Sequence, residues 1–136
     1  MGIFTKEWAS GKDLGILVFR VAIAILLLYG HGWGKLTTAF SGQEIQFMDP
    51  LGIGAKLSFY LVVFGEGICA ILLILGLFSR FAALCLVFTF LVIFNHHKAD
   101  GFEVLELRLF YLFGFVALAF SGPGKYSLDK LFIFKK

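Results

Sequence analysis

The sequence predicts an all-α membrane protein, a single domain with four transmembrane helices, and three observations carry this prediction. The chain has 136 residues, of which 60% are hydrophobic and only 15% charged, and 18 are phenylalanine. Its mean hydropathy is +0.92. A chain of this composition has more apolar surface than a soluble domain of this size can bury. The apolar residues form four long runs without the polar–apolar alternation of β-barrel strands, and about 20 such residues cross a hydrocarbon core of about 30 Å.

The four runs predict helices at residues 14–33, 55–78, 81–95 and 104–121. The first begins after Asp13 and ends in "YGHGWGK". Helix-breaking Pro50, Gly52 and Gly54 precede the second. The tight turn "LFSRFAA" makes the second and third an antiparallel hairpin, and the short third helix must tilt less or end in a protein-lined or thinned region.

Glycines and a proline in "SGPG" end the fourth helix. An amphipathic tail follows at residues 125–136, where Ser127 and Asp129 can cap a short segment on the membrane surface. The long loop before the second helix carries apolar residues that either dock on the membrane surface or cover the mouth of the bundle: Ile45, Phe47, Met48 and Leu51.

Basic residues predict the orientation of the bundle. The tails and the turn after the second helix hold seven of them: Lys6, Lys12, Arg80, Lys125, Lys130, Lys135 and Lys136. The other side holds three: Lys35, Lys56 and Lys98. By the positive-inside rule, both termini lie in the cytoplasm of a multi-pass protein of the cell (inner) membrane. The basic residues therefore indicate contact with membrane lipid, and no nucleic-acid partner.

A carboxylate near the middle of the second helix is the first candidate functional group. Glu66 lies within "LVVFGEGICAILLILG", where an ionised side chain costs about 2.5–3.5 kcal/mol unless it faces protein or water. Arg20 and His31 share one stripe of the first helix, about 9 Å inward and about 7 Å outward of Glu66. We expect Arg20 to be the partner, because a guanidinium holds a carboxylate with two hydrogen bonds.

The sequence leaves three roles open for Glu66. It forms a buried ion pair that fixes helix register, it faces a proton or ligand at the floor of an outward-opening cavity, or it is protonated and inert. A second polar cluster lies at the outer helix ends and includes His31, Lys35, His96, His97, Glu103 and Glu106. Adjacent His96 and His97 point about 100° apart, so no metal site is expected.

The outer cluster instead predicts a solvated helix end or a polar vestibule for a small ligand, such as a quinone headgroup, gated by His96 or His97 with Glu106. Arg108 follows Glu106 by two residues, so it projects from nearly the opposite face of the helix. If Glu106 faces the bundle, Arg108 extends to lipid headgroups or contacts a partner subunit.

Several segments, in their order and spacing, resemble the DoxX family of small four-helix membrane proteins: "FRVAIAILLLYGHGWGKL", "DPLGIG", "GEGICAILLILGLFSRFAAL", "FNHHKADGFEVLELRLFYL" and "SGPGKYSLD". The resemblance covers nearly the whole chain after residue 14, and Arg108 departs from it, because a small apolar residue is usual there. The family takes its name from a subunit of an archaeal thiosulfate:quinone oxidoreductase.

The resemblance therefore implies a membrane subunit of a quinone-linked redox system, with or without catalysis of its own. Two alternatives stay open, a non-catalytic assembly or structural subunit of a larger membrane complex and a proton or small-solute conduit formed by a homo-oligomer. Membrane lipid and other membrane subunits are the partners expected in the first two cases.

Overall fold

The computed structural model describes Glu7, residues 9–42, Phe47 and residues 49–132, and these residues form helices joined by short turns and one longer loop. Four helical stretches are long and apolar enough to cross a membrane. They span Ser10–Phe40, Ala55–Leu75, Ser79–His97 and Phe102–Ser121. The predicted all-α fold with four membrane-spanning helices is confirmed, whereas the cytoplasmic location of the termini stays a prediction.

Two of the four spans are interrupted by a π-helical turn. The first comprises α2 (Ala9–Leu27), the π-helix η1 (Leu28–Gly32) and α3 (Trp33–Phe40). The second comprises α4 (Ala55–Val63), the π-helix η2 (Phe64–Cys69) and α5 (Ala70–Leu75). The remaining helices are α6 (Ser79–His97), α7 (Phe102–Ser121) and the short α8 (Leu128–Phe132).

The first span is longer than expected. Its 31 residues rise about 46 Å at 1.5 Å per residue, which exceeds a hydrocarbon core of about 30 Å. The helix continues past "GHGWG" because the π turn keeps the backbone hydrogen-bonded where a helix end was expected. As a result, α3 extends past the apolar part of the span and carries Lys35 with it.

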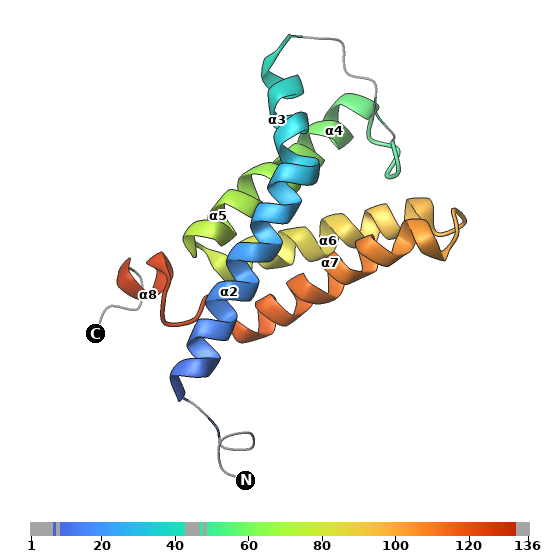
Figure 1. Cartoon of the computed structure of the whole chain (residues 1–136). Coiled ribbons are helices and arrows are strands. Elements are labelled where there is room, and N and C mark those ends of the chain that lie inside the picture. The colour runs from blue at the N-terminus through green and yellow to red at the C-terminus, as the bar shows by residue number, and fades with distance from the viewer. Residues whose placement is uncertain (1–6, 8, 43–46, 48, 133–136) are drawn as a thin grey trace.

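The helices form two pairs that diverge. In Figure 1, α6 and α7 run side by side as an antiparallel hairpin, while α2–α3 runs along α4–α5. The pairs are packed together around α5, the middle of α2 and the start of α6. They separate toward α3 and α4 on one side and the α6–α7 turn on the other. The space between the separating pairs is where the polar side chains gather.

Small side chains allow the helices to pack closely where the pairs meet. The fully buried core residues include Ala24, Ala70, Ala82 and Ala83, together with Leu27, Leu86 and Phe115. Small residues at helix contacts are typical of membrane proteins, in which van der Waals packing holds helices together. The outward faces carry large apolar side chains such as Phe113 and Phe120, as expected for contact with lipid.

The C-terminal segment closes the end of the bundle at which α5 ends and α6 begins. The Asp129 carboxylate accepts hydrogen bonds from the backbone N–H groups of Phe78 (2.6 Å) and Ser79 (2.8 Å), which caps the start of α6. Ser127 accepts a bond from the Lys130 N–H and caps α8, as predicted, whereas Asp129, which was also predicted to cap this segment, caps α6 instead. Residues 133–136 of the predicted tail, and Ile45 and Met48 of the loop, lie outside the described residues.

Candidate functional site

A buried ion pair lies at the centre of the candidate site. The Glu66 side chain is 4% exposed, and its Oε2 accepts a hydrogen bond from Lys35 Nζ at 2.6 Å. Lys35 comes from α3 and retains 25% of its side-chain exposure. The ammonium group compensates the carboxylate and reaches it from the open side of the bundle. A charge pair of this kind is costly to bury, and each charge is tolerated there because the other compensates it.

The two π turns bring the first and second spans together beside this pair. Glu66 lies in η2 and His31 lies in η1, and the two turns pack against each other. Gly32 allows the contact, because a Cβ at this position would overlap the backbone carbonyl of Glu66. π turns are rare and occur frequently at functional sites. In this protein two π turns pack against each other beside the buried Glu66 carboxylate. We therefore place the candidate site at this level of the bundle.

A cavity of about 560 Å³ opens beside the ion pair. Its polar wall includes His31, Lys35, Glu66, His97 and Arg108. Its apolar wall includes Phe47 from the loop and Phe90 from α6. The volume falls in the range of about 300–1,000 Å³ that is usual for small-molecule sites.

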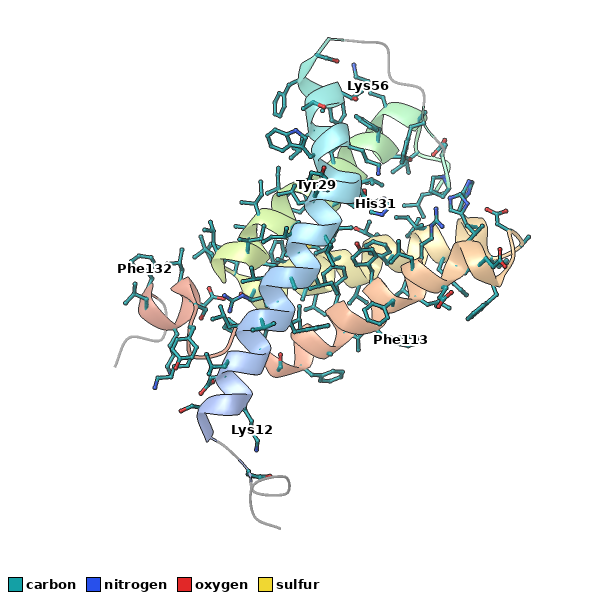
Figure 2. All side chains as sticks on the ribbon, viewed as in Figure 1. Lys12, Tyr29, His31, Lys56, Phe113 and Phe132 are labelled. Carbon is teal, nitrogen blue, oxygen red and sulfur yellow. The ribbon has the colours of Figure 1, made fainter. Side chains whose placement is uncertain are left out.

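Aromatic rings line the inner end of the cavity. The Tyr111 ring meets His31 edge-on with 6.0 Å between ring centroids, and it stacks on Phe90 at 5.4 Å. Figure 2 shows His31 on the side of the first span that faces the α6–α7 pair. The Tyr111 side chain is buried and carries a hydroxyl group. The cavity therefore combines flat apolar faces with hydrogen-bonding groups.

Four of the predicted site residues lie together on this cavity, namely His31, Lys35, Glu66 and His97. His97 Nδ1 also pairs with Asp100 Oδ2 at 2.6 Å, at the turn between α6 and α7. His96 does not line the cavity; its exposed ring meets that of His97 edge-on at 4.9 Å. Of the two histidines proposed as a gate, only His97 is therefore placed to act as one.

The predicted orientation of the start of α7 is reversed. Glu106 is exposed and lies outside the cavity, whereas half-buried Arg108 lines it. One Arg108 N–H donates to the carbonyl of Val104 at 2.6 Å, one turn earlier. Glu103, Val104 and Leu107 accompany Arg108 on the cavity wall. The face was misassigned because Glu106 is near the helix end, where an exposed carboxylate is not penalised.

Arg20 is not the partner of Glu66, contrary to the prediction. Its side chain is almost fully buried but points to the end of the bundle that the C-terminal segment closes. The guanidinium donates to the backbone carbonyls of Leu73 (2.8 Å), Pro123 and Tyr126 (3.0 Å). The Leu73 carbonyl near the end of α5 also accepts from the Gly76 N–H, so Arg20 adds a second bond to it and joins the end of α5 to the C-terminal segment.

Sequence reasoning missed Tyr111, the polar aromatic residue on the inner cavity wall. A tyrosine in the middle of an apolar helix was a usable signal, because its hydroxyl usually finds a partner when buried. Among the residues that the structure describes, no three His, Cys, Asp or Glu side chains gather as a metal site. The chemistry that this cavity offers is hydrogen bonding, proton exchange and aromatic stacking.

Comparison with known proteins identifies the family. The DoxX family profile matches residues 15–98. The inner membrane protein YqjF of Escherichia coli (strain K12) is 35% identical, over 88% of this chain and 93% of its own length. The inner membrane protein YphA of the same organism is 27% identical, over 91% and 94%. No solved structure matches significantly. With four membrane-spanning helices and these relatives, the chain is a multi-pass cell membrane protein that belongs to the DoxX family.

Proposed function

We propose that this protein is the quinone-binding subunit of a membrane redox system, and that the headgroup binds in the cavity beside Glu66. The observation that carries the proposal is the buried Glu66–Lys35 pair on the wall of a cavity large enough for an aromatic ring. A quinone is a flat ring with two carbonyl acceptors, so it requires donors at its edge and apolar surfaces at its faces.

The cavity residues match both requirements. Lys35, His31 and Arg108 supply N–H donors for a carbonyl oxygen. Phe90 and Tyr111 supply ring surfaces on which a headgroup can stack. Lys35 already donates to Glu66, and an ammonium group has further protons available for a ligand.

The same residues fit the proton balance of quinone reduction. A quinone takes up two electrons and two protons to become a quinol, and His31, His97 and Glu66 are titratable groups on the cavity wall. In this proposal the electrons come from a partner subunit. The lysine-rich ends favour a cytoplasmic location for both termini, and the cavity then opens near the outer surface of the membrane.

Direct binding tests the proposal. Duroquinone (tetramethyl-1,4-benzoquinone) is titrated into the full-length protein in lipid nanodiscs, and binding is followed by quenching of intrinsic fluorescence. Glu66→Gln should weaken binding at least tenfold, which corresponds to about 1.4 kcal/mol. Glu106→Gln is the matched control, because Glu106 is an exposed carboxylate outside the cavity. Saturable binding that is equally strong in all three proteins, or no binding to the wild type, contradicts the proposal.

A further inference from the structure

A second, almost wholly apolar groove of about 400 Å³ lies along the outer surface between α4 and α6. Leu61 and Phe64 form one wall, and Leu84 and Phe88 form the other. Each of these side chains is at least 37% exposed, in a part of the helices that crosses the membrane. The groove therefore faces the acyl region of the bilayer.

The groove adjoins the polar cavity. Val62 of α4 lines both spaces. On α6, Thr89 and Val92 line the groove, and the next residue in each case, Phe90 and Ile93, lines the cavity. The two spaces therefore lie on opposite sides of the contact that the second span makes with α6 through η2.

At one level, direct contact between the helices separates the two spaces. At Gly65 the helices touch, because a Cβ there would lie 2.6 Å from Thr89 Oγ1. Val62 lies one turn further out, on the side toward which α4 and α6 separate in Figure 1. Val62 thus borders both the groove and the cavity, beyond the point of helix contact.

The outer end of the groove is covered by a structured turn. Pro50 and Leu51 line the groove there. The preceding Asp49 carboxylate fixes this turn, because it accepts bonds from the N–H groups of Ile53 and Gly54, both at 2.9 Å, and from the Ser58 hydroxyl at 3.1 Å. The groove is thus bounded at its outer end by the turn and open sideways to lipid.

From this arrangement we infer that the groove holds the hydrocarbon tail of the ligand whose headgroup binds in the polar cavity. The inference rests on the proposed function and narrows the ligand to an amphipathic quinone with a single long chain, which enters sideways from the bilayer. The aromatic rings of Phe90 and Tyr111 on the wall of the adjoining cavity favour this occupant over a phospholipid, because a flat headgroup can stack on them and a phosphate group cannot.

Affinity alone tests this inference poorly. A tail that moves from lipid to the groove leaves one apolar environment for another, so it gains packing contacts but little hydrophobic free energy. Position is the sharper observable. A suitable probe is 2,3,5-trimethyl-1,4-benzoquinone that bears a decyl chain with a photoreactive diazirine at its end, bound to the full-length protein in nanodiscs and mapped by mass spectrometry after irradiation.

The tail should crosslink to α4 and α6, at Leu61, Leu84 or Phe88, and excess duroquinone should reduce the yield at least fivefold. Two controls measure background labelling. Decane with a diazirine but no headgroup reports labelling by a free tail, and irradiated duroquinone reports labelling by the quinone ring itself. Leu84→Trp should fill the groove and lower crosslinking at least fivefold while duroquinone still binds. Leu26→Trp is the matched control, because Leu26 is similarly exposed (63% against 58%) and lines neither space.

The outcomes separate the two proposals. The groove assignment would be overturned if crosslinks were spread over the lipid-facing surface, including Phe113 of α7, and did not respond to duroquinone. Glu66-dependent binding of duroquinone would in that case still support the cavity as the headgroup site. Equal losses in Leu84→Trp and Leu26→Trp would also overturn it. If duroquinone and the decyl compound both fail to bind, the proposed function and the groove assignment fall together.

Discussion

Replacing Lys35 with methionine should destabilise the folded protein strongly. The Lys35 ammonium is 2.6 Å from Glu66 Oε2, and the Glu66 side chain is 4% exposed. Methionine has a similar length but no charge, so it leaves an uncompensated carboxylate inside the bundle. Removing one partner of a buried pair costs about 3–5 kcal/mol. We therefore expect the free energy of unfolding to fall by about 3–5 kcal/mol.

Reversible unfolding in mixed micelles of dodecyl maltoside and SDS, followed by intrinsic fluorescence, measures this loss. Lys56→Met is the matched control, because Lys56 is an exposed lysine on α4, and it should change stability by less than about 0.5 kcal/mol. The double variant Lys35→Met/Glu66→Met removes both charges and should regain most of the loss, since apolar side chains of similar volume often replace a buried pair at little cost. A double variant as unstable as Lys35→Met would refute the reasoning.

Three further predictions concern the supports of the site. Arg20→Gln should lower the free energy of unfolding by at least about 3 kcal/mol in the same assay, because bonds from a charged group are worth about 1.5–3 kcal/mol each and three carbonyls lose them. Arg80 is exposed, so Arg80→Gln should change the free energy of unfolding little. Equal losses in the two variants would contradict this prediction. Partial desolvation raises the pKa of Asp49, but the bonds from Gly54, Ser58 and Ile53 outweigh it and hold the pKa below its usual value. The stabilisation of the turn by the Asp49 carboxylate is thus complete above the unfolded-state pKa of about 3.9 and is lost as the pH falls through the lower folded-state value. In that pH range, hydrogen exchange of the Gly54 N–H should accelerate beyond its intrinsic pH dependence. Asp49→Asn must abolish this extra acceleration. Gly32→Ala should push η1 away from the Glu66 carbonyl and weaken duroquinone binding at least tenfold. Gly34→Ala is the control and should bind normally, because a Cβ at Gly34 meets no atom within 4 Å. Normal binding by both variants would contradict the role of the contact between η1 and η2.

Hydropathy was sufficient to predict the fold. Runs such as that around Phe113 must be helical in lipid, because every backbone N–H and C=O group there has to be paired internally. The second helix was predicted to end at residue 78, but α5 ends three residues earlier at Leu75, because Gly76 adopts a left-handed conformation with φ of 73°. Periodicity also placed His31 and Glu66 on facing stripes, and the structure brings both to one cavity.

The partner of Glu66 was missed because the first helix was predicted to end at residue 33. Lys35 follows His31 by four residues and lies on the same stripe, and the helix continues through η1 into α3 and carries Lys35 to Glu66. Arg20 was misassigned for a different reason. Its acceptors are backbone carbonyls, two of them more than 100 residues later in the chain, and the sequence gives no sign of such contacts.

The most direct test of the ligand assignment is to identify what the native protein carries. The protein is extracted from its own membranes in styrene–maleic acid particles, and quinones are quantified per protein by mass spectrometry against bulk membrane lipid. We predict a long-chain quinone enriched toward one per chain in the wild type and in Glu106→Gln, and reduced to the bulk level in Glu66→Gln. Bulk-level quinone in all three preparations would contradict the assignment of the Glu66 cavity as a quinone site.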